Sequence, residues 1–232
     1  MRICVSVGHS ILRNGSCTSS TGIINEYSYC KVLAPYVKKA LEKDGHIVDV
    51  VICPERVFES QLEEQSYKIP RINKIEYDLV MELHLNNYNT KAKGTTVLYK
   101  SKKGREFAEK IQESLSSAFI NRETTQKKNL YMLNKTKAPA VLLEMFFDDN
   151  KIDCNTAKNL GLTGMANLIA KALRPNKEIP KSSIKSIVDY MKSINLDSSY
   201  DNRRKLAKRY GIANYTGTAK QNVILLDKIR TL

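Results

Sequence analysis

Hydrophobic residues in the first three quarters of the chain alternate between short continuous runs and helical spacing. Apolar runs typical of buried β-strands cover residues 3–7, 47–52, 77–83, 95–99, 130–133 and 140–143. Between them, apolar side chains three and four positions apart predict helices over residues 27–43, 105–119 and 157–173. This alternation predicts an α/β domain with a mixed, mostly parallel sheet flanked by helices.

Beyond this domain the pattern is helical only. Three stripes of apolar side chains, beginning at Ile184, Tyr200 and Val223, predict a small all-α domain of three helices. The preceding stretch contains two prolines and shows no apolar periodicity, which is typical of a linker. We therefore expect a first domain over residues 1–174, a linker over 175–182 and a helical domain over 183–232.

Other features of the chain limit where it can act. No apolar run approaches the roughly 20 residues of a membrane-spanning helix. The N-terminus turns polar after seven residues, so we expect synthesis in a host cytoplasm without a signal peptide, and no membrane insertion. The five cysteines are scattered and never form a CxxC pair, which is typical of a reduced protein.

The chain is strongly basic, with a formal net charge of +14. Such a charge attracts polyanions, including nucleic acid, anionic membranes and the acidic polymers of a bacterial wall. Residues 176–232 contain 12 Lys and Arg against 5 Asp and Glu, a net charge of +7. Half of the excess charge therefore lies in the last quarter of the chain.

Two of the three histidines end predicted strands. His9 and His84 each follow such a strand, Glu144 ends another, and Glu26 begins the first helix. Ligands gather at the carboxyl ends of parallel strands, so these four side chains converge on one rim if the strand before Glu144 runs parallel to the others. His46 lies in a turn ahead of a strand, and we expect it to be structural.

Two histidines and a carboxylate form a catalytic zinc set, with one position left open for water. His9, Glu26 and His84 can fill this set, and Glu144 can shuttle a proton, which together would support metal-assisted amide hydrolysis. Spacing alone leaves the alternative open. A histidine at a strand end is commonly a hydrogen-bonded structural residue, and a glutamate at a helix start stabilises the helix dipole in any protein.

Several short motifs follow one another in a defined order: Gly8-His9, Asn25-Glu26, His84-Leu85-Asn86, Gly94-Thr95-Thr96, and Pro139 to Glu144 with Asn150. Over about residues 1–173 this order resembles the zinc-dependent N-acetylmuramoyl-L-alanine amidases of family three. The resemblance implies that His9, Glu26 and His84 bind one zinc ion and that Glu144 is the catalytic carboxylate. It also implies cleavage of the amide bond between N-acetylmuramic acid and L-alanine of the peptidoglycan stem peptide.

The chain departs from the family pattern near these motifs. Ser10 follows Gly8-His9 where glycine is common, and Met145 replaces the usual glycine after the catalytic glutamate. Glu82 stands two residues before His84, where many members carry a small residue. Because residues two apart share a strand face, Glu82 could orient a metal ligand, accept a hydrogen bond from substrate, or alter the pKa of the bound water. Asn86, in the second histidine motif, is a further candidate for such a role.

The C-terminal segment contains a series of short motifs: Val188 to Ser193, Asp197 to Ser199, Asn202-Arg203, Leu206-Ala207, Tyr210 to Ile212, Asn214-Tyr215, Gly217 to Ala219 and Gln221-Asn222. Together they are similar to the small helical wall-binding domains of some phage endolysins of Gram-positive, clostridial-type hosts. Its basic and aromatic residues suit an anionic wall polymer or glycan, because arginine matches phosphate and aromatic rings stack on sugars. A charged but merely solvated face is the simpler alternative. A helix-turn-helix is another, but the turn over residues 211–217 is longer than the usual three or four residues, which makes nucleic acid an unfavoured partner.

The sequence therefore predicts a peptidoglycan hydrolase of the endolysin type that is made in the cytoplasm and acts on the cell wall after the membrane has been permeabilised. A host autolysin or sporulation amidase with the same chemistry is an alternative. So is a non-catalytic wall-binding or nucleic-acid-binding protein, although the intact set of candidate site residues counts against it.

Overall fold

The computed structural model describes residues 1–174 and 185–230. The chain divides into two compact units, Met1–Pro175 and Asn176–Leu232. The expected linker over residues 175–182, and the start of the expected helical domain at 183, lie outside the described residues. Within those residues, no helix is both long and apolar enough to cross a membrane.

The first unit is built around a six-stranded sheet with the order β2-β1-β3-β6-β4-β5. Neighbouring strands pair in parallel except β4 and β6, which pair antiparallel. The strands are β1 (Arg2–Val7), β2 (Ile47–Val51), β3 (Leu79–Asn86), β4 (Thr95–Tyr99), β5 (Asn121–Gln126) and β6 (Ala140–Phe147). This confirms the predicted mixed, mostly parallel sheet.

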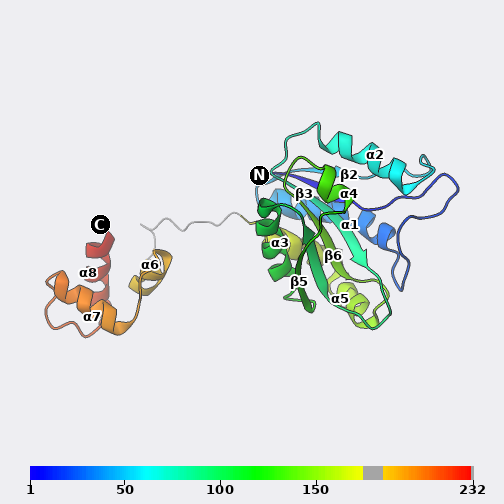
Figure 1. The fold of residues 1–232 in the computed structure, drawn as a ribbon. Helices are drawn as coiled ribbons and strands as arrows, with labels where there is room; N and C mark the ends of the chain where they lie inside the picture. Colours follow the sequence, from blue (N-terminus) through cyan, green and yellow to red (C-terminus); the bar gives the residue numbers. More distant parts are fainter. Residues whose placement is uncertain (175–184, 231–232) are drawn as a thin grey trace. The chain divides into compact units, whose positions relative to one another are not determined.

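Helices cover both faces of the sheet (Figure 1). They are α1 (Glu26–Lys43), α2 (Gln61–Ile72), α3 (Lys102–Leu115), α4 (Tyr131–Lys135) and α5 (Lys151–Lys171). On one face α1, α3 and α5 pack against alternate strand residues such as Met81 and Leu143. On the other face α2 and α4 pack against the intervening residues, such as Val80 and Leu142. Both faces are therefore buried, which explains the near-continuous apolar strands.

Three elements differ from the predicted pattern. No helix was predicted over Gln61–Ile72, where α2 lies. The polar segment Asn121–Gln126 forms β5, an edge strand that pairs only with β4 and is largely exposed, so it carries no apolar signal. Residues 130–133, expected as a strand-like run, instead belong to α4 and its N-cap, and Met132 and Leu133 pack onto the face covered by α2. A run of four residues is too short for its periodicity to separate the two structures.

His46 is structural, as expected from its position in a turn. Its Nε2 lies 2.9 Å from Leu173 O, so the ring links the start of β2 to the residues just after α5. The contact is buried and lies away from the other two histidines.

The second unit contains α6 (Ile187–Ser193), α7 (Tyr200–Arg209) and α8 (Ala219–Arg230). These helices enclose a small apolar core that includes Met191, Ala207, Leu225 and Leu226. Thr218 and Gln221 cap the start of α8 reciprocally, each side chain accepting a hydrogen bond from the other's backbone N–H at 3.3 Å. The predicted small all-α arrangement is therefore confirmed.

Candidate functional site

His9 lies just beyond the end of β1, where the backbone is held against β3. The backbone N–H of Gly8 donates to Leu83 O at 3.1 Å. His9 itself has a φ of 65°, in the left-handed region that residues other than glycine adopt uncommonly. Such a conformation costs about 1–3 kcal/mol and is concentrated at functional sites. The local backbone therefore supports a functional role for His9.

Gly8 makes room for the second histidine. A Cβ on Gly8 would lie 2.2 Å from the His84 ring, so no larger residue fits while the ring keeps its place. The rings of His9 and His84 consequently meet edge to face, with centroids 4.8 Å apart.

Glu26 approaches both histidines from the start of α1. Asn25 caps this helix by accepting a hydrogen bond from the N–H of Ser28, which fixes where the helix begins. Glu26 Oε2 accepts from the Ser20 hydroxyl at 3.0 Å, and Oε1 accepts from the Leu85 N–H at 3.0 Å. The carboxylate is thus buried and held from two sides.

Glu144 is aligned with His84 by strand pairing. In the parallel register of β3 and β6, His84 pairs with Glu144, and aligned residues on parallel neighbours point to the same face of the sheet. Among the described residues Glu144 Oε2 has no hydrogen-bond partner, although it is buried. A buried oxygen without a partner at such a place is a candidate contact for substrate or water.

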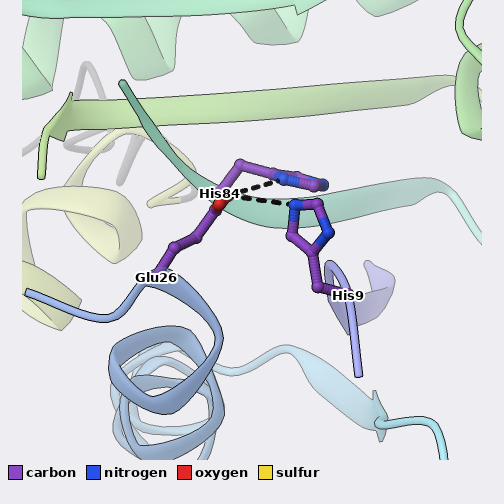
Figure 2. Close-up of side chains that lie close together, drawn as sticks. All are labelled: His9, Glu26 and His84. Atoms are coloured by element: carbon purple, nitrogen blue, oxygen red, sulfur yellow. Dashed lines mark hydrogen bonds and ion pairs between the residues drawn. The ribbon is translucent and has the colours of Figure 1, made fainter. Parts of the chain in front are cut away.

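Three donor atoms converge between these elements (Figure 2). His84 Nδ1 lies 2.9 Å and His9 Nε2 3.4 Å from Glu26 Oε1. One donor atom from each of the three residues lies within 4.8 Å of the others. Two ligands about 2.1 Å from a tetrahedral ion are roughly 3.4 Å apart, so this donor set fits a zinc ion. The two histidine side chains are each 14% exposed, which leaves the cluster accessible from solvent.

The electrostatics of the cluster favour positive charge. Burial by itself would raise the pKa of Glu26, but hydrogen bonds from His84 and His9 hold it well below its usual range. Burial would lower the pKa of His84, but Glu26 and Glu82 as acceptors raise it to about 10. The surrounding carboxylates therefore stabilise a cation at this position.

For Glu144, in contrast to Glu26, the effect of burial on the pKa exceeds that of its neighbours. Burial raises its pKa to about 7, with His84 opposing this shift and Glu26 and Glu82 adding to it. A carboxyl group with a pKa near neutrality can both accept and return a proton, which is the property of a general acid–base group.

The six residues singled out in the sequence occupy different positions. His9, Glu26 and His84 form the cluster, and the strand register places Glu144 beside it. Glu82 is buried, with Oε2 3.3 Å from His84 Nε2, so it borders the cluster. Asn86 ends β3, and its side-chain oxygen accepts a hydrogen bond from the N–H of Asn87.

Sequence reasoning missed two charged residues behind the histidines. Glu64 and Lys68 of α2 are 1% and 2% exposed, which is unusual for such side chains. Glu64 accepts from the Thr18 hydroxyl at 3.1 Å, and Lys68 forms an ion pair with Glu82. Their spacing of four residues on one helix was the available signal, but charged residues in a helix usually mark its solvated face.

The first unit is similar to known amidases in sequence and in structure. Residues 3–175 match the sequence model of the N-acetylmuramoyl-L-alanine amidase family, and residues 157–231 match a domain of unknown function. The catalytic domain of the CD27L endolysin targeting Clostridia difficile is 52% identical, with a TM-score of 0.73. That similarity covers 75% of this chain and 96% of the solved one.

Two curated relatives come from Listeria phages. The endolysin of phage A511 is 47% identical over 76 residues, which are 30% of this chain and 22% of the relative. The L-alanyl-D-glutamate peptidase of phage A118 is 49% identical over 57 residues, which are 25% of this chain and 20% of the relative. The match spans about a fifth of the length of each of these relatives.

Replacing Gly8 tests the packing of the cluster. We expect Gly8→Ala to displace the His84 ring and lower the affinity for zinc at least tenfold, because the added methyl group occupies the space of the ring. Zinc affinity is measured by competition with a colorimetric chelator. Gly164→Ala in α5 is the control, because the nearest side chain to its methyl group is Leu160 and not a residue of the cluster. Unchanged zinc affinity in Gly8→Ala would contradict this packing.

Proposed function

The chain belongs to the N-acetylmuramoyl-L-alanine amidase family, and on that premise we propose that it is a zinc-dependent endolysin. It hydrolyses the amide bond between N-acetylmuramic acid and L-alanine of the stem peptide. Peptidoglycan is the substrate of these amidases, and the family is generally zinc-dependent. The observation that carries the proposal is the convergence of His9, Glu26 and His84 beside the buried carboxyl of Glu144.

One zinc ion would be held by His9, Glu26 and His84, whose Nε2, Oε1 and Nδ1 atoms face one another in the cluster. A bound zinc ion supplies Lewis-acid polarisation of the carbonyl and lowers the pKa of water towards 7. The orphaned Glu144 Oε2 and the carboxylates that favour a cation support this assignment.

Glu144 moves the proton in the proposed reaction. Its carboxylate accepts a proton from water as the oxygen attacks the lactyl carbonyl carbon, and then returns it to the leaving nitrogen of L-alanine. The carbon–nitrogen bond breaks, leaving a carboxyl group on the lactyl ether and a free amine on the peptide. Burial raises the pKa of Glu144, which favours a carboxyl group that can both accept and return this proton.

The second unit directs the enzyme to the wall in this proposal. Residues 183–232 bind an anionic wall polymer or glycan, while the amidase domain, residues 1–174, performs the chemistry. The net charge of +7 over residues 176–232 supports this division, because a basic segment attracts anionic polymers. The enzyme is made in the host cytoplasm and reaches the wall after membrane permeabilisation.

A cavity of about 430 Å³ on the second unit is the candidate wall-binding site. It is lined by Arg204 and Lys208, one helical turn apart on α7, and by the segment from Gly211 to Tyr215. Among the described residues Arg204 pairs with exposed Asp201 at 3.5 Å, an interaction weak enough to exchange for an anionic ligand. Two cations beside an aromatic ring suit a polymer that alternates phosphate and polyol or sugar.

Substitutions separate metal binding from proton transfer. We expect Glu144→Gln to retain zinc but lose activity by about 10²–10⁴-fold, because the proton acceptor is removed. His84→Ala loses both zinc and activity, whereas His46→Ala keeps both. Zinc content is measured by elemental analysis and activity by clearing of purified Gram-positive walls. A fully active Glu144→Gln protein would refute the role of Glu144.

Charge removal tests the second unit. We expect Arg204→Gln with Lys208→Gln to weaken attachment to purified walls at least tenfold, with unchanged activity on soluble muropeptides. The control pair Lys192→Gln with Lys220→Gln removes the same charge from outside the cavity. Attachment is measured by co-sedimentation at several salt concentrations. An equal loss in both pairs would mean that overall charge, and not the cavity, attracts the wall.

A further inference from the structure

We propose that helix α2 is a positioning element for the two metal-binding histidines. Glu64 acts on His9 through Thr18, and Lys68 acts on His84 through Glu82. The inference rests on the proposed zinc site but adds a role for residues that touch neither metal nor substrate.

The two charged residues of α2 are buried side by side under the site. Glu64 and Lys68 are four positions apart and so lie on one face of the helix. They are 1% and 2% exposed, and burying charge is costly unless each group is paired. Glu64 contacts Thr18 and Lys68 contacts Glu82, and each of these partners lies beside one of the two histidines.

The first contact path reaches His9. The Thr18 hydroxyl donates to Glu64 Oε2 at 3.1 Å and lies 3.3 Å from His9 Nδ1. If His9 Nε2 binds the metal, Nδ1 carries the hydrogen and donates it to Thr18. Ser10 also donates to Glu64 Oε2, at 3.0 Å, which fixes the carboxylate. The path therefore holds the ring with Nε2 towards Glu26.

The second path reaches His84. Lys68 Nζ forms a buried ion pair with Glu82 Oε1. The other oxygen, Glu82 Oε2, lies at ion-pair distance, 3.3 Å, from His84 Nε2, which makes no hydrogen bond among the described residues. Lys68 Nζ also donates to Val7 O at 3.0 Å, two residues before His9. One ammonium group thus links the ends of both strands that carry the histidines.

Thr18 lies beside Nδ1 of His9, and Glu82 lies beside Nε2 of His84. The other nitrogen of each ring faces Glu26. Carboxylate groups behind a metal-binding histidine fix its tautomer and orientation, and their loss commonly lowers metal affinity 10–100-fold. A purely structural role for Lys68 and Glu64 would instead change folding stability without a specific effect on zinc.

The experiment measures zinc affinity and unfolding of the full chain, stripped of metal and titrated with zinc against a colorimetric chelator. We expect Thr18→Val and Lys68→Met each to lower zinc affinity about 10–100-fold. Lys31→Met, which removes an exposed lysine paired with Glu55, is the control and leaves affinity unchanged.

If Lys68→Met alone unfolds, zinc affinity is measured instead in the double variant Lys68→Met with Glu82→Leu. Replacing both members of a buried ion pair by apolar residues commonly preserves stability. We therefore expect the double variant to fold but to keep the reduced zinc affinity. Histidine-ring NMR of the zinc-loaded wild type should show hydrogen on Nδ1 of His9 and Nε2 of His84.

Folded variants with wild-type zinc affinity would overturn the role of α2 while leaving the metal site intact. The opposite ring tautomers in the wild type would also overturn it. Failure of the wild type itself to bind zinc would instead refute the proposed function, on which this inference rests.

Discussion

Parallel pairing of β1, β3 and β6 is the constraint on which the candidate site depends. Because the three strands run in one direction, their carboxyl ends share one edge of the sheet. The register then pairs Val7 with Leu83 and His84 with Glu144. A shift of one residue would turn His84 to the opposite face of the sheet. The apolar layers that determine the register therefore also determine which residues meet at the site.

The site also requires charge to be buried within this apolar framework. Glu26, Glu64, Glu82 and Lys68 are all nearly inaccessible to solvent, and each is held by hydrogen bonds or an ion pair. Removing one partner of such a set leaves the other uncompensated, which is strongly destabilising. The network therefore gives the histidines a fixed orientation that water-exposed side chains would lack. Its elements come from distant parts of the sequence and meet only in the folded sheet.

The sequence made some of this structure predictable and left other parts hidden. Strands that are buried on both faces appear in the sequence as continuous apolar runs. Because the carboxyl ends of parallel strands lie at one edge of a sheet, His9, His84 and Glu144 could be predicted to lie there together. The exposed edge strand Asn121–Gln126 had no such signal, because its side chains are polar and largely exposed. Lys68 was not recognised either, because its spacing of four residues from Glu64 does not show that tertiary contacts bury both side chains.

The most direct test of the central claim is chemical identification of the bond that is cut. Purified Gram-positive walls are digested with the full chain, with a chelator, and with chelator followed by added zinc, and newly exposed N-terminal residues are determined. The account predicts new N-terminal alanine that disappears with the chelator and returns with zinc. New reducing sugars, a different N-terminal residue, or cleavage that is unaffected by chelation would contradict it.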